Sequence, residues 1–173
     1  MSRIVLTGGP GSGKTSVIES LEKLGYNIIP EPARLLIEEY KQNSPHLLPA
    51  ISKENRVLFA KTIEDLSIKN FNDNISGFFD RSILDEIGYR LRYNVDISTE
   101  LELAAKDLRY KTVFIFPFWQ EIFKTDDIRH ETADEAKILF EFLYKAYTKY
   151  GYSPIIVPKM SVEERVKFIL NNI

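Results

Sequence analysis

The sequence predicts an α/β protein with three layers, in which a parallel sheet of about five strands lies between helices. Five short apolar runs are bounded by turn residues, and segments with the apolar spacing of helices separate them. Because helices between strands supply the crossover connections of a parallel sheet, this alternation favours an α/β fold. The length of 173 residues is sufficient for one core of this kind. We therefore expect residues 1–173 to form a single domain.

The five expected strands are runs of mainly branched and aromatic residues. In an open parallel sheet, ligands bind beyond the carboxyl ends of the strands, so the residues that follow each run are candidates for a functional site. The runs cover Arg3–Thr7, Tyr26–Pro30, Ile75–Asp80, Lys111–Pro117 and Pro154–Val157.

The expected helices carry start and stop signals as well as apolar stripes. Gly25 would end the first helix as a C-terminal cap, and Pro32 suits the first turn of the second. Two further helical patterns cover residues 54–71 and the segment after Ser82. Three more helices would begin with the Ser/Thr-x-x-Glu spacing of a capping box, at Thr99, Thr132 and Ser161.

The segment after the first strand reads GGPGSGKT and matches the phosphate-binding pattern G-x-x-x-x-G-K-[ST] without a mismatch. Glycines let backbone N–H groups converge on phosphate oxygens, and the start of the following helix adds partial positive charge. Lys14 is expected to contact the β- and γ-phosphates, and Thr15 to offer its hydroxyl to Mg²⁺. The motif therefore predicts a P-loop NTPase. The predicted nucleotide-binding residues are Gly8, Gly9, Pro10, Gly11, Ser12, Gly13, Lys14, Thr15 and Ser16.

Glu31 and Arg34 follow the second strand and would lie on nearby faces of a helix start. Glu31 could accept a proton from a substrate hydroxyl or position a water molecule, and Arg34 could bind an anionic part of the substrate. In the alternative interpretation, Glu31 is a carboxylate favoured by the helix dipole, and Arg34 is its surface partner.

The third strand ends in Asp80, Arg81 and Ser82. An acid that closes a strand beside the phosphate loop is expected to control Mg²⁺ or to act as a general base, so Asp80 is a candidate for both roles. Arg81 is a candidate for binding a phosphate or an acidic substrate group. Ser82 and Asp85 also have the spacing of a helix start, so a capping role for Asp85 is at least as well supported as a functional one.

A charged segment, residues 124–131, lies between the fourth strand and the Thr132 helix, in the position of a lid. Arg129 could move onto the transferring phosphoryl group, whose transition state needs a cation. The alternative is an ordinary solvated loop. The aromatic pair Phe118 and Trp119 would line a substrate pocket or, more commonly for such residues, pack in the core.

The composition excludes several kinds of chemistry. Without cysteine there can be no disulfide, thiolate nucleophile or cysteine zinc site, and two histidines argue against a histidine-rich metal site. A net charge of -2 gives no reason to expect nucleic acid or an anionic membrane as a partner. Features of a signal peptide and of a membrane span are absent from the sequence, so we expect a cytoplasmic location.

Taken together, these motifs resemble those of single-domain, kinase-like P-loop ATPases of the AAA-domain type. The resemblance is carried by the phosphate loop, the Glu31–Arg34 and Asp80–Ser82 segments, Asp127-x-Arg129 and the ending VPKMSVEERVKFIL. The resemblance spans nearly the whole chain. It implies a nucleotide-kinase-like fold, ATP and Mg²⁺ at the phosphate loop, a base at Glu31 or Asp80, and a lid arginine at Arg129.

The sequence is also similar, more distantly, to deoxynucleoside kinases and nicotinamide riboside kinases. Their second strand likewise ends in a Glu-Pro type segment, and their third ends in an acid-Arg-Ser segment. This sequence differs from the deoxynucleoside kinases in its short, arginine-poor lid and in lacking a tryptophan after Arg34.

Two functions follow from these motifs. The first is a phosphotransferase that moves the γ-phosphate of ATP to a small-molecule hydroxyl or phosphate acceptor, with Lys14, Arg81 and Arg129 stabilising the transferred group. The second is a nucleotide switch, or a slow ATPase or GTPase, that acts through a protein partner. Residues 85–88 match the D-x-x-G segment of GTPases, but they lie beyond the strand end, and the sequence contains no N-K-x-D.

Overall fold

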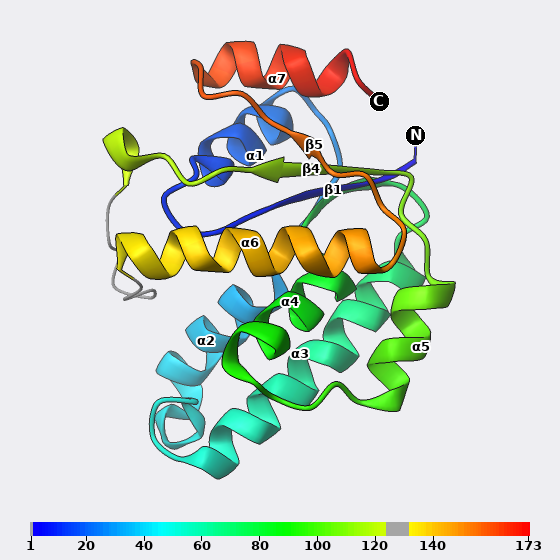
Figure 1. Ribbon diagram of the computed structural model, residues 1–173. Coiled ribbons are helices and arrows are strands. Elements are labelled where there is room, and N and C mark those ends of the chain that lie inside the picture. The colour runs from blue at the N-terminus through cyan, green and yellow to red at the C-terminus, as the bar shows by residue number, and fades with distance from the viewer. Residues whose placement is uncertain (1, 124–131) are drawn as a thin grey trace.

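The computed structural model describes residues 2–123 and 132–173, and its centre is a five-stranded sheet between two groups of helices (Figure 1). The order across the sheet is β2-β3-β1-β4-β5, and neighbouring strands are parallel. Each strand overlaps one predicted run, so the α/β class and the five-stranded parallel sheet are confirmed. The strands are β1 (Arg3–Gly8), β2 (Ile28–Ile29), β3 (Gly77–Asp80), β4 (Thr112–Phe116) and β5 (Ile155–Ile156).

One face of the sheet is covered by α1 (Lys14–Lys23) and α7 (Val162–Leu170), which lie side by side (Figure 1). Side chains alternate along a strand, so Ile4 and Leu6 of β1 both face these helices and are buried with them in one core. This packing fixes the start of α1, and with it the phosphate loop, above the central strand.

The opposite face is covered by α3 (Lys53–Asp73), α4 (Ile83–Tyr93), α5 (Thr99–Asp107) and α6 (Ala133–Lys149). Val5 of β1 and Phe79 of β3 point to this side and pack in a second core with α4 and α6. The three layers expected from the sequence are therefore present.

Next to this second layer lies α2 (Pro32–Asn43), which packs against α3. Tyr40 of α2 and Phe59 of α3 are 6.4 Å apart between ring centroids, in an edge-to-face arrangement. The two helices are joined by residues 44–52, which include the short 3-10 helix η1 (Pro45–Leu47). Together α2, α3 and α4 enclose a space beside the carboxyl ends of β2 and β3.

Capping explains where most helices begin. The capping boxes at Thr132 and Ser161 form as predicted, because each hydroxyl accepts from the backbone N–H three residues on while the glutamate there accepts in return. At α5 the prediction is wrong by one residue, because the hydroxyl of Ser98, not that of Thr99, accepts from the N–H of Leu101. Gly25 follows α1 with a φ of 86°, as expected for a C-terminal cap.

Within the described part of the chain, no helix combines the length and apolar character needed to cross a bilayer.

Candidate functional site

The phosphate loop connects the central strand β1 to the N-terminus of α1. Gly13 precedes the helix with a φ of 74°, and an added Cβ there would lie 2.8 Å from the Arg165 guanidinium. Gly8 has a φ of 150°, and a Cβ on it would lie 2.6 Å from the Phe116 carbonyl oxygen. Glycine is therefore required at both positions, by conformation and by space. A loop backbone at the start of a helix can provide N–H groups for an anion, and anion binding by this loop stays a prediction of the motif.

Lys14 is nearly buried, and its ammonium forms an ion pair with the carboxylate of Asp80. Asp80 ends β3, which is the direct neighbour of β1, and it pairs in register with Leu6. Two of the predicted site residues are thus in contact. The geometry brings a lysine that can bind phosphate and a carboxylate that can interact with a metal ion to the same point above the sheet.

Thr15 and Ser16 are exposed at the first turn of α1. A threonine hydroxyl at this place and the carboxylate of Asp80 are oxygen donors of the type that Mg²⁺ prefers. The donor set therefore fits a magnesium ion associated with a nucleotide on the loop.

Arg81 directly follows β3 and has an unusual backbone for a residue with a side chain. Its φ of 72° lies in the left-handed region, which is stabilised by a hydrogen bond from its N–H to the carbonyl oxygen of Leu6, 3.0 Å away. A non-glycine residue in this conformation stores strain of about 1–3 kcal/mol, and such residues often occur at functional sites. The strained turn directs the guanidinium toward the end of β2.

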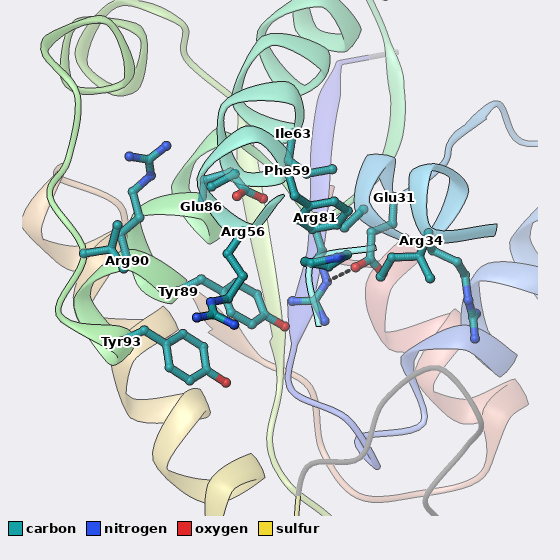
Figure 2. A pocket seen from close by; sticks show the side chains of 15 residues that line it. Glu31, Arg34, Arg56, Phe59, Ile63, Arg81, Glu86, Tyr89, Arg90 and Tyr93 are labelled. Carbon is teal, nitrogen blue, oxygen red and sulfur yellow. Dashed lines mark ion pairs between the residues drawn. The ribbon is translucent and has the colours of Figure 1, made fainter. Parts of the chain in front are cut away.

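There the guanidinium meets Glu31, with 3.0 Å between Arg81 Nε and Glu31 Oε1 (Figure 2). Both residues are buried, with exposed fractions of 5% and 6%. Burial alone would lower the pKa of Arg81, but electrostatic interactions, the largest with Glu31, raise it well above its ordinary value. Arg81 is therefore a permanent cation beside the carboxylate of Glu31.

Asp85 supports this pair from inside the protein. One of its carboxylate oxygens accepts from Thr7, at 2.5 Å, and lies 3.3 Å from Arg81 Nη1. The other accepts from the Tyr147 hydroxyl at 2.5 Å and from the backbone N–H of Ser82 at 2.9 Å. Asp85 closes the capping box of α4, as the S-x-x-D spacing suggested. It thereby links β1, β3 and α6 behind the site.

A cavity of about 450 Å³ opens beside the Glu31–Arg81 pair (Figure 2). Its walls come from α2, α3 and α4 and combine aromatic and aliphatic side chains with charged ones. Arg34, predicted to bind substrate, also lines it. The lining includes Glu31, Ala33, Arg34, Ile37, Arg56, Phe59, Ile63, Arg81, Glu86, Tyr89, Arg90 and Tyr93.

Comparison with known proteins identifies the family. The model of a family described as "AAA domain" matches residues 3–165, which is most of the chain. The chain belongs to this AAA domain family. A search among curated proteins found no match.

Solved structures similar to this AAA domain include deoxyadenosine kinase from M. mycoides. With bound dATP, that protein has a TM-score of 0.68 and 18% identity, and the match covers 98% of both chains. The same kinase with the products dCMP and a flexible dCDP also has a TM-score of 0.68, at 16% identity over 98% of this chain and 97% of that one. At this identity the likeness establishes the fold. The expectation of a kinase-like or ATPase P-loop protein agrees with both comparisons.

Three residues that sequence reasoning did not select lie at the site of this AAA domain. Glu86 and Arg56 line the cavity. Arg165 of α7 donates to the carbonyl oxygen of Ser12 at 3.0 Å and lies 4.6 Å above the ring of Trp119. Arg165 could have been noticed, because it interrupts the apolar stripe of α7 formed by Val162, Val166 and Ile169.

The remaining predicted residues are placed as follows. Arg129 and the rest of the expected lid, residues 124–131, lie outside the described residues. Trp119 is half-buried beneath Arg165, and Phe118 packs 5.3 Å from the ring of Phe123. Among the residues that the structure places around the cavity beside Glu31, neither aromatic is found.

Proposed function

We propose that this AAA domain is a phosphotransferase that moves the γ-phosphoryl group of ATP to a small molecule bound in the cavity. The observation that carries the proposal is that two neighbouring residues at the end of β3 contact both the phosphate loop and the wall of the cavity. Asp80 contacts Lys14 of the phosphate loop, and Arg81 contacts Glu31 at the wall of the cavity. A donor site and an acceptor site would therefore meet at one strand end.

ATP would be held by the backbone N–H groups of Gly8–Thr15 and by Lys14, with additional contacts from Ser16. Mg²⁺, held through Thr15 and Asp80, would neutralise charge on the phosphates when bound. Arg165 stabilises the phosphate loop by donating a hydrogen bond to the carbonyl oxygen of Ser12. Arg129 remains our prediction for a lid cation.

We assign the base to Glu31 and the control of the metal to Asp80. Glu31 lines the cavity, whereas Asp80 is not among the residues that line it and contacts Lys14 of the phosphate loop. A general base must be within hydrogen-bond reach of the proton that it removes, and Glu31 faces the space in which an acceptor fits. Arg81 and Arg34 would contact the acceptor or the transferred group.

In the transfer step, a hydroxyl oxygen of the acceptor bonds to the γ-phosphorus while the bond from that phosphorus to the β–γ bridging oxygen breaks. ADP leaves, and the proton of the hydroxyl passes to Glu31. If the acceptor group is itself a phosphate, its oxygen attacks in the same way and no proton is transferred. Arg81 stabilises the negative charge on the moving group from a fixed position.

A nucleotide switch is less well supported. Its sequence signal, residues 85–88, lies within α4, where the carboxylate of Asp85 is buried and hydrogen-bonded to Thr7 and Tyr147. A switch segment must change its contacts with the bound nucleotide, whereas this segment caps a helix.

The experiment is the release of ADP from Mg·ATP by the purified protein, alone and with nucleosides, nucleotides, ribosides and sugars. A kinase consumes ATP much faster with one class of acceptor, and the phosphorylated product appears in equal amount to ADP. Slow release that no small molecule stimulates, despite confirmed ATP binding, would overturn the proposal. We expect no nucleic acid or membrane partner.

A further inference from the structure

The cavity beside Glu31 carries an excess of cationic side chains. Four arginines line it, Arg34, Arg56, Arg81 and Arg90, against two carboxylates, Glu31 and Glu86. The question is which of these charges already have a carboxylate neighbour, because a cation without one can bind an anionic ligand without first giving up an ion pair.

Three of the arginines have carboxylate neighbours in the protein. Arg81 is paired with Glu31, at 3.0 Å, and lies 3.3 Å from Asp85. Arg90 is paired with the fully buried Glu64, with 2.7 Å between Nη2 and Oε2. Arg34 lies 3.9 Å from Glu38, one turn along α2.

The side chain of Glu86 does not offset the positive charge of the arginines at neutral pH. Burial, and secondarily the charge of Asp85, raises the pKa of Glu86 to about 8. Its carboxyl group is therefore mostly protonated at pH 7, and it can offer a hydrogen bond without cancelling a cation.

Arg56 is the remaining cation. It comes from the first turns of α3, is exposed at the cavity, and acts on Glu54 of the same helix through its charge, but within residues 2–123 and 132–173 its guanidinium has neither a hydrogen bond nor an ion pair. Figure 2 shows its side chain extending from α3 in the direction of Tyr89 and Tyr93 of α4. A guanidinium that has no hydrogen-bond partner among the described residues and lies beside aromatic rings suits a carboxylate or phosphate at the end of an organic molecule.

We propose that the acceptor is an organic anion whose carboxylate or phosphate binds Arg56 while its reacting group lies at Glu31. This inference rests on the proposed phosphotransfer, because it assigns the chemical class of the acceptor at the same cavity. Phe59, Tyr89 and Tyr93 would contact the apolar body between the two ends.

The test uses matched probe pairs that differ in one anionic group: nicotinate riboside and nicotinamide riboside, ribose 5-phosphate and ribose, and 4-(hydroxymethyl)benzoate and its amide. Binding is measured by titration calorimetry and turnover by ADP release. We expect the anionic member to bind about ten- to a hundred-fold more tightly, because a charge-assisted hydrogen bond has that effect. The first and third pairs test a carboxylate, and the second tests a phosphate.

Arg56→Gln should remove the difference within each pair, and Arg56→Lys should retain part of it. Lys69→Gln is the matched control, since Lys69 is an exposed cation on the same helix that pairs with Asp73. Equal or tighter binding of the neutral members, a preference that survives Arg56→Gln, or no binding of any anionic member at millimolar concentration would overturn the inference.

The two proposals can fail separately. If a neutral acceptor stimulates ADP release and Arg56→Gln leaves that stimulation unchanged, the phosphotransferase stands and the anionic acceptor is wrong. If anions bind in an Arg56-dependent way and never increase ADP release or become phosphorylated, the anion site stands and the phosphotransferase is wrong.

Discussion

Nε of Arg81 lies 3.0 Å from Oε1 of Glu31, although the two residues follow different strands of the sheet. The contact exists because β2 and β3 are adjacent and parallel, so their carboxyl ends project to the same side. A carboxylate fixed by a buried guanidinium at the edge of a cavity is suited to accept a proton from a bound hydroxyl.

Glu31→Gln is expected to reduce the acceptor-dependent rate by about 10²–10⁴-fold, which is the usual contribution of a general base. ATP binding should change little, because Glu31 belongs to the cavity and not to the phosphate loop. Steady-state kinetics with the best acceptor and calorimetry with ATP check both. Glu39→Gln, an exposed change on the same helix, should behave as wild type. A parallel loss of ATP affinity would assign Glu31 to holding the fold.

Lys14→Ala should reduce kcat/KM by about 10²–10³-fold, because it removes the cation that contacts the β- and γ-phosphates. Lys23→Ala is the control, since Lys23 is exposed at the other end of α1. ATP affinity and ADP release are the readouts. Unchanged values in the Lys14 variant would remove the assignment of the phosphate loop.

Asp80→Asn should lower turnover more than it lowers ATP affinity. The amide keeps the shape of the side chain but loses the charge that would attract Mg²⁺, so a higher magnesium concentration should be needed for half-maximal rate. A magnesium titration of ADP release measures this directly. A magnesium dependence identical to that of wild type would return Asp80 to a structural role with Lys14.

Asp85→Asn should destabilise the protein by about 3 kcal/mol, because a buried charge that interacts with Arg81 is removed and the guanidinium is left less compensated. The change should appear as a lower midpoint of urea unfolding. Tyr147→Phe, which removes one hydrogen bond to the same carboxylate, should have a smaller effect of about 1 kcal/mol. Equal effects of the two variants would contradict a central role for Asp85.

The pH dependence of stability should reflect Glu86. Its pKa is raised from an ordinary value of 4.5 to about 8, so between these values the folded protein holds more protons than the unfolded chain. Stability from this group should therefore fall as pH rises through that window. Urea unfolding at several pH values should show a flatter profile for Glu86→Gln than for wild type. The same slope in both proteins would show that Glu86 ionises normally.

The strands and most helix starts could be predicted because their causes are local. Each strand is an apolar run, and the hydroxyls of Thr132 and Ser161 find a glutamate three residues on. At α5, Ser98 and Thr99 are adjacent residues that can both cap a helix, so spacing alone could not select Ser98.

The contacts of the site depend on the arrangement of distant elements. The sequence indicated Arg34 as a neighbour of Glu31. In the structure, Arg81 forms an ion pair with Glu31 because β2 and β3 are adjacent. Likewise, Arg56 reaches the cavity only because α3 packs between α2 and α4. Arg56 is an exposed arginine in a charged helix, so the sequence carries no local sign of its position at the cavity.

The ion pair between Lys14 and Asp80 means that the protein carries its own competitor for the phosphate-binding ammonium. A nucleotide that takes over Lys14 would release the Asp80 carboxylate, and a magnesium ion arriving with the nucleotide would give that carboxylate a new partner. The affinity for the nucleotide then depends on the difference in free energy between the ion pair of Lys14 with the nucleotide and the ion pair of Lys14 with Asp80. Because magnesium would bind the released carboxylate, this affinity is linked to the magnesium concentration. The Lys14–Asp80 salt bridge would therefore distinguish free ATP from magnesium-bound ATP, because only magnesium-bound ATP brings a new partner for the Asp80 carboxylate.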